Sequence, residues 1–114
     1  MTPAKAYFNK RKQLTRALAD LNNIFKNAII NYLSSIKEVV SCNTPANETK
    51  GKVCLEEIGW HYDDATDIVT ITYSEFDKFG YGDLEDTKIL EIQSSVIDKF
   101  MSEAYNNYWK QFEA

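Results

Sequence analysis

Few of the residues that usually perform catalysis occur in this chain of 114 residues. General acid–base and nucleophilic catalysis need several groups that converge on one atom, and histidine is the usual member. The single histidine, His61, lies between Trp60 and Tyr62 in a strand-like segment, where alternation turns it toward the opposite, wetter face. Neither Cys42 nor Cys54 lies in a pattern typical of a nucleophile, and no G-x-S-x-G motif is present. We therefore expect a protein that is not an enzyme.

Metal and phosphate motifs are also incomplete. Asp63, Asp64 and Asp67 resemble the start of a calcium loop, but Ala65 stands at the third position, and the glycine and glutamate that should follow are missing. One histidine and two separated cysteines are too few for a structural zinc site. The G-x-G of residues 80–82 precedes a strand rather than a helix, which favours a tight turn over a dinucleotide site. We predict no metal and no cofactor.

The charge is distributed unevenly along the chain. The net charge is −4, yet residues 1–40 carry seven basic and two acidic side chains, and residues 41–114 carry six and fifteen. Many of the acids surround one turn, where they are interleaved with aromatic residues. Such a surface suits a partner with a basic surface, although acidic turns can also serve solubility alone. The predicted partner-binding residues are Phe76, Asp77, Phe79, Tyr81, Asp83, Glu85 and Asp86.

Basic residues gather near the start of the chain, where Tyr7 and Phe8 add aromatic surface. Lys10, Arg11 and Arg16 are candidate phosphate-binding residues, because clustered cations neutralise phosphates. The sequence pI of about 5.0 is unlike that of a dedicated nucleic-acid binder, so nucleic acid is not an expected partner. A solvated helix face, or a contact with the acidic half of a sister subunit, explains the same residues.

The elements that would position these groups follow from periodicity. Residues 1–40 predict one long helix, because no glycine interrupts a run rich in good helix formers. Three strands between residues 53 and 92, joined by turns, predict an antiparallel sheet, and residues 95–113 predict a second helix. The predicted fold is α+β with the order α-β-β-β-α, in a single domain that spans residues 1–114.

An apolar seam along the first helix indicates self-association. Leu14, Leu18, Leu21 and Phe25 alternate in steps of four and three, the spacing of a coiled coil. The second helix would span only about 27 Å, roughly half the length of the first, and cannot cover the whole seam. We therefore predict a homo-oligomer whose interface contains these four residues.

The sequence also bears on compartment and on the cysteines. The first residues lack the apolar core of a signal peptide, and no stretch approaches the length needed to cross a bilayer, so we expect a cytoplasmic protein without membrane contact. Cys42 and Cys54 flank a loop, which leaves a bridge geometrically possible, but two cysteines without an export signal are more often free thiols.

The chain is a short single domain with an acidic strand-turn-strand run from Trp60 to Ile92 and no catalytic constellation. In these respects it resembles the small accessory proteins of bacteriophages, including anti-defence and anti-CRISPR proteins. The resemblance implies a phage-encoded inhibitor in the host-cell cytoplasm that blocks a defence nuclease through its acidic surface. The alternative is an oligomer that sequesters a phosphate-bearing small molecule or nucleotide, with Lys10, Arg11 or Arg16 at the subunit interface.

Overall fold

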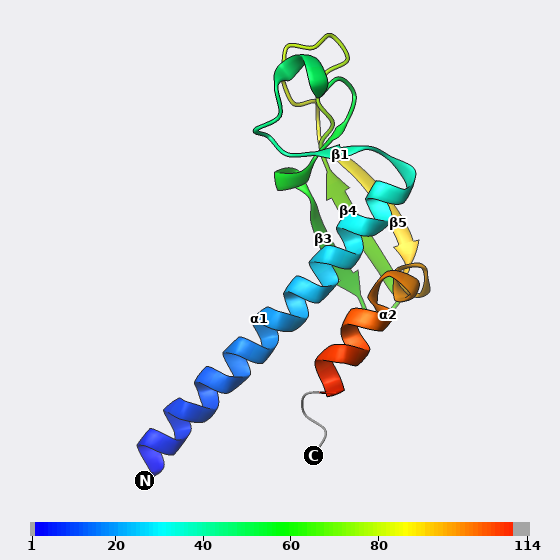
Figure 1. The fold of residues 1–114 in the computed structure, drawn as a ribbon. Coiled ribbons are helices and arrows are strands. Elements are labelled where there is room, and N and C mark those ends of the chain that lie inside the picture. The colour runs from blue at the N-terminus through cyan, green and yellow to red at the C-terminus, as the bar shows by residue number, and fades with distance from the viewer. Residues whose placement is uncertain (1, 111–114) are drawn as a thin grey trace.

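The structure is a computed structural model that describes residues 2–110, apart from the side chains of Ser102, Ala104 and Trp109. Figure 1 shows a long first helix, a three-stranded antiparallel sheet and a shorter second helix, which confirms the predicted α+β class. In chain order the elements are α1 (Pro3–Ile36), β1 (Val39–Val40), η1 (Ala46–Glu48), β2 (Val53–Cys54), η2 (Leu55–Glu57), β3 (Gly59–Asp63), β4 (Ile68–Tyr73), β5 (Lys88–Gln93) and α2 (Ser94–Lys110).

The helix α1 begins with a side-chain cap and ends four residues before the predicted position. The hydroxyl of Thr2 accepts a hydrogen bond from the N–H of Lys5 at 3.3 Å, and a proline occupies the first turn. At the other end Lys37 is extended, and residues 39–40 pair in parallel with β2. The prediction of a helix through residue 40 was therefore wrong. Two consecutive β-branched valines favour an extended backbone and gain ladder hydrogen bonds there.

The main sheet has the order β3-β4-β5 and is antiparallel throughout. In the central strand β4, buried Val69, Ile71 and Tyr73 alternate with half-buried residues, as the sequence predicted. Residues 53–54, predicted to join this sheet, instead pair with β1, and the third strand of the sheet begins only at Lys88. Residues 74–87 are consequently a long excursion between β4 and β5 and not a tight turn.

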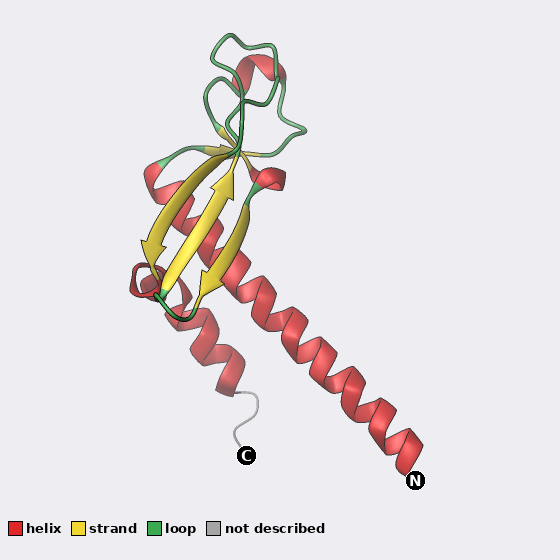
Figure 2. Cartoon of the chain, turned by 180° about the vertical axis from the view of Figure 1, so that it is seen from behind, coloured by secondary structure: helices red, strands yellow, loops and turns green. Residues whose placement is uncertain are grey.

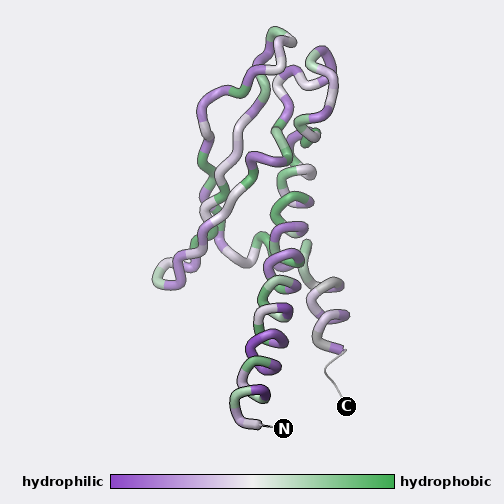
Figure 3. Tube along the Cα trace, turned by 90° about the vertical axis from the view of Figure 1, so that its left-hand side faces the viewer, coloured by the Kyte–Doolittle hydropathy of each residue, from purple (hydrophilic) through white to green (hydrophobic). Residues whose placement is uncertain are grey.

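Both helices lie on the same face of the sheet, so the body has two layers (Figure 2 and Figure 3). Ile29 and Leu33 of α1, Ile71 of β4 and Ile97 of α2 are almost completely inaccessible to solvent. These four side chains belong to one core cluster that joins all three parts of the fold. The predicted second helix is confirmed, and its last predicted residues, 111–113, lie outside the described part of the chain.

The molecule is elongated, with extents of 61 × 28 × 26 Å. The hydroxyl of Tyr108, in the last described turns of α2, donates to the carbonyl of Ala17 at 3.3 Å. The part of α1 that precedes this contact extends beyond the body, and we call residues 3–16 the projecting segment (Figure 1). Loops from residues 41–52 and 74–87 form the opposite end of the molecule, which we call the head.

Candidate functional site

The predicted acidic loop is carried by a continuation of β4 into the head. Beyond Tyr73 the chain stays extended, and its residues pair with the segment around β2. The N–H of Cys54 donates to the carbonyl of Ser74 at 2.9 Å, and the N–H of Phe76 donates to the carbonyl of Lys52 at 2.8 Å. The returning arm forms a bridge between Leu84 and Phe76. This paired base presents residues 77–86, which we call the tip loop.

One carboxylate organises the tip loop. The Oδ1 atom of Asp77 accepts hydrogen bonds from the N–H groups of Phe79 and Gly80, both at 2.8 Å, and of Tyr81 at 3.1 Å. Its Oδ2 atom accepts from the N–H of Asp83 at 2.8 Å. Desolvation alone would raise the pKa of Asp77, but the four N–H donors outweigh it and hold the pKa below its usual value. Asp77 therefore maintains the loop from inside and is not a freely available surface carboxylate.

Two glycines let the tip loop close against the rest of the head. Gly80 has φ +86° and Gly82 has φ +78°, in the left-handed region that side chains rarely adopt. A Cβ atom on Gly80 would lie 2.7 Å from Cε of Lys50, and one on Gly82 would lie 3.2 Å from Cβ of Ala46. The Lys50 side chain thus brings a positive charge to the loop, and the head is less uniformly acidic than the sequence suggested.

The aromatic side chains of the tip loop point outward. Phe79 is 79% exposed and Tyr81 is 76% exposed, and their ring centroids are 6.3 Å apart. The predicted acids Asp83, Glu85 and Asp86 are also exposed. All five predicted residues therefore belong to the exposed surface of the tip loop.

Phe76 does not belong to that surface. It is only 5% exposed, and the arm that carries it is paired along both edges, with the segment around β2 on one side and with Leu84 on the other. The inclusion of Phe76 among the partner-binding residues was therefore wrong. A phenylalanine next to acidic residues in a turn-rich segment gave no sign in the sequence that its arm would be covered.

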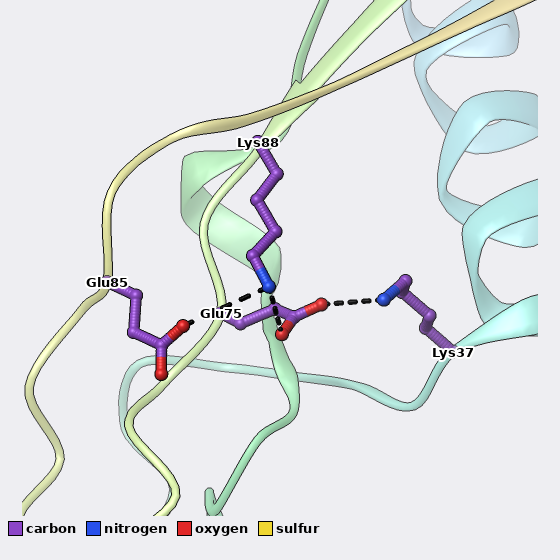
Figure 4. Close-up of polar contacts among 4 residues, drawn as sticks. All are labelled: Lys37, Glu75, Glu85 and Lys88. Atoms are coloured by element: carbon purple, nitrogen blue, oxygen red, sulfur yellow. Dashed lines mark hydrogen bonds and ion pairs between the residues drawn. The ribbon is translucent and has the colours of Figure 1, made fainter.

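A buried ion-pair cluster fixes the base of the tip loop (Figure 4). The Glu75 carboxylate lies 2.7 Å from Nζ of Lys37 and 2.9 Å from Nζ of Lys88. Its side chain is 7% exposed, against 39% and 41% for the two lysines. Glu85 lies at the edge of the cluster, 3.9 Å from Lys88. The cluster joins the end of α1, the continuation of β4 and the start of β5.

Electrostatics around Glu75 favour its charged form. Burial alone would raise the pKa of Glu75, but the hydrogen bonds and charges of the two lysines overcome it and lower the pKa. The hydrogen bond to Glu75 correspondingly raises the pKa of Lys37 and of Lys88. Sequence reasoning missed this cluster, since Lys37 and Glu75 are 38 positions apart and no local spacing marks them as partners.

The four predicted interface residues of α1 occupy different environments. Leu14 and Leu18 are each 60% exposed, and Leu21 is half-buried. Phe25 packs on Trp60 of the same chain, with ring centroids 5.7 Å apart, and contacts the core. The apolar seam therefore begins as exposed surface and continues into the protomer's own core. Phe25 already packs against residues of its own chain.

The candidate phosphate-binding residues all lie on the projecting segment and are exposed. Lys10 and Arg11 line a shallow depression with Tyr7, Leu14 and neighbouring residues, and Arg16 lines a second one with Phe8, Arg11 and their neighbours. Among the described residues, those lining both depressions come from α1 alone. One protomer therefore does not surround a ligand at these positions.

The remaining candidates are dispersed over the described residues. His61 is exposed and lines an open depression with Trp60 and Tyr62. Cys42 is exposed, Cys54 is buried, and both are free thiols. Within residues 2–110, no group of three or more histidine, cysteine or carboxylate side chains could hold a metal ion. No helix in that part of the chain has the length and apolarity needed to span a membrane.

Comparisons of the chain with protein-family models, with curated proteins and with solved structures found no match.

Proposed function

We propose that this chain is a non-catalytic protein-binding module that engages a basic surface through its tip loop. The observation that supports this most strongly is the exposure of Phe79 and Tyr81 on a loop whose backbone is fixed by Asp77. Large aromatic side chains are among the residues that contribute most to binding at protein interfaces. Two of them held 6.3 Å apart at the end of an elongated molecule form a compact contact patch.

The fixed backbone favours binding because less conformational entropy is lost on association. The loop is bonded to itself through Asp77 and is anchored to the body through the Glu75 cluster. The backbone positions that carry the aromatic side chains are therefore fixed before any partner arrives. Exposed Asp83, Glu85 and Asp86 add negative charge to the same loop, which favours a partner of opposite sign and accelerates encounter.

A basic surface of this kind occurs where a protein binds nucleic acid. A module that occupies the nucleic-acid-binding surface of an enzyme would displace the nucleic acid and so inhibit that enzyme. The specific form of the proposal is therefore inhibition of a nuclease by competition, in line with the resemblance to phage anti-defence proteins. Inhibition is expected to weaken as salt rises, because screening reduces the attraction between opposite charges.

The test uses a photo-reactive amino acid at position 79 to capture the partner, followed by affinity measurements on the purified pair. The double variant F79S/Y81S and the charge-reversal variant D83K/E85K/D86K should each lose binding. Ile89→Ser is the matched control, because Ile89 is 66% exposed on β5, outside the tip loop. Circular dichroism confirms that the variants remain folded.

Unchanged affinity of the charge-reversal variant would refute the electrostatic part of the proposal. Unchanged affinity of F79S/Y81S would refute the assignment of the tip loop altogether. A captured partner without a basic surface, or one whose binding strengthens with salt, would also contradict it. Competition with nucleic acid is measured separately, by the salt-dependent displacement of a fluorescent oligonucleotide from the partner.

A further inference from the structure

From Tyr7 to Leu21, α1 displays an apolar stripe that the described chain leaves largely exposed. Leu14 and Leu18 are each 60% exposed and Tyr7 is 59% exposed. Together with half-buried Leu21 they follow the seam that, further along α1, packs into the core. The hydroxyl of Tyr108 in α2 donates a hydrogen bond to the carbonyl of Ala17, and this contact leaves the neighbouring Leu14 and Leu18 exposed.

Most of the cations of this segment lie away from the stripe. Residues 3–19 carry five basic and no acidic side chains. With 3.6 residues per turn, Lys5, Lys12 and Arg16 fall on the side of the helix opposite Leu14. Lys10 flanks the stripe, and Arg11 occupies the seam position between Tyr7 and Leu14, in the depression that contains all four residues. Three of the five positive charges would therefore remain in water if the stripe were covered.

We propose that the stripe packs against the same stripe of a second copy in an antiparallel pair, independently of the tip loop. A symmetric pair needs one self-complementary surface, and this stripe supplies it. We assign the register in which Tyr7 faces Leu18 of the second copy and Arg11 faces Leu14, a register that the coiled-coil spacing allows. The overlap is residues 4–21, about 27 Å of helix.

The antiparallel orientation follows from charge and shape. A parallel pair would align Arg11 with Arg11 and Lys10 with Lys10, which places like charges together. An antiparallel pair places Arg11 against an apolar layer, from which its long side chain can reach water. It also directs the two bodies to opposite ends, so that the sheets and heads of a molecule 61 Å long do not collide.

The size of the contact indicates a weak dimer. Helices that overlap over about 27 Å bury less than the roughly 800 Å² per partner of a standard interface. We therefore expect association in the range of about 1 µM to 1 mM. Because each segment is strongly positive, screening by salt removes repulsion, and the dimer is expected to strengthen as salt rises.

The experiment is sedimentation velocity of the full chain across that concentration range, at about 0.1 M and about 1 M salt. We expect the mass to rise from 13.1 kDa toward twice that value with concentration, and at lower concentration in high salt. The variant L14E/L18E should weaken association by a factor of about ten or more. Ile89→Glu is the matched control, an equally exposed apolar residue on β5 that should leave association unchanged.

Orientation is tested by disulfide formation in a Cys42→Ser background. A mixture of the Tyr7→Cys and Leu18→Cys chains should form a heterodimeric bridge, whereas either chain alone should not, because an antiparallel pair separates identical positions. Disulfide bonds between two copies of the same single variant would indicate a parallel pair and overturn the proposal.

Other outcomes would also overturn it. A monomer at every concentration, or a dimer unaffected by L14E/L18E, excludes pairing through the stripe. Association that weakens with salt, and that F79S/Y81S abolishes, would indicate that the tip loop of one copy binds the basic segment of the next. Association only on addition of inorganic pyrophosphate would indicate a phosphate-bearing ligand between the subunits. If F79S/Y81S loses partner binding while the dimer remains intact, the result supports the tip-loop proposal and the dimer proposal independently of each other.

Discussion

Replacing Glu75 by glutamine should destabilise the fold by about 1–2 kcal/mol at neutral pH. Glutamine keeps the size of the side chain but removes the charge that Lys37 and Lys88 approach at 2.7 and 2.9 Å. Removing one partner of a fully buried ion pair costs about 3–5 kcal/mol. Here the lysines are about 40% exposed and can regain water, so each lost charge-assisted hydrogen bond is expected to cost about 1 kcal/mol or less. For a domain of this size, that loss corresponds to about 5–10 °C in Tm.

The pH dependence distinguishes lost charge from lost packing. The folded pKa of Glu75 is lowered, so its contribution is complete above the unfolded value of about 4.3 and disappears as pH falls through the folded value. The pKa values of Lys37 and Lys88 are raised, so their contribution is complete below about 10.4 and disappears as pH rises through the folded values. The stability difference between wild type and Glu75→Gln should therefore be constant near neutral pH and shrink at both extremes.

Urea denaturation of the two proteins at acidic, neutral and strongly alkaline pH measures this difference. Glu85→Gln is the matched control, because Glu85 is 3.9 Å from Lys88 and more exposed, and its replacement should change stability by less than about 0.5 kcal/mol. A difference that is the same at acidic and neutral pH would show that the glutamine disturbs packing. No difference at neutral pH would refute the view that the cluster stabilises the head.

Three further predictions concern other parts of the molecule. Asp77→Ala should abolish the hydrogen-exchange protection of the Phe79 amide, measured by NMR, while the protection of β4 is retained; unchanged protection at Phe79 would exclude Asp77 as the organiser of the loop. Leu33→Ala should lower the free energy of unfolding by about 2–5 kcal/mol in urea denaturation, because this core side chain is 0% exposed. Cys42 should react rapidly with a thiol reagent in the native protein, whereas Cys54, whose pKa burial raises, should react only on unfolding; equal rates would contradict its burial.

The strongest periodic signals predicted the architecture correctly. The alternating residues of β4, the apolar face of α1 and the second helix appear where their spacing placed them. The end of α1 was less predictable, because Val39 fits both a helical seam and a strand. Its strand pairing depends on residue 53, across a loop whose path the sequence does not specify. Short parallel pairs of this kind lack a local signal.

The candidate surface was predictable only in part. Outward-facing Phe79 and Tyr81 follow from a turn that contains glycines at both sides of Tyr81. The sequence could not reveal that the Asp77 carboxylate accepts backbone hydrogen bonds within the loop, or that the Phe76 side chain is buried. Both outcomes depend on how the loop folds back on itself. The neighbouring lysine at position 50 likewise reaches the loop only through tertiary packing.

The uninterrupted helix α1 gives the molecule a long, rigid axis. A helix of 34 residues extends about 51 Å, and no glycine lies within it to act as a hinge. The base of the tip loop is joined to the C-terminal end of this helix by the ion pair of Lys37 with Glu75. Two bodies attached at opposite ends of one chain would therefore be held at a set separation, unlike bodies joined by a flexible linker, whose distance fluctuates. Inserting seven residues into the projecting segment would lengthen the helix by about 10 Å without changing either end.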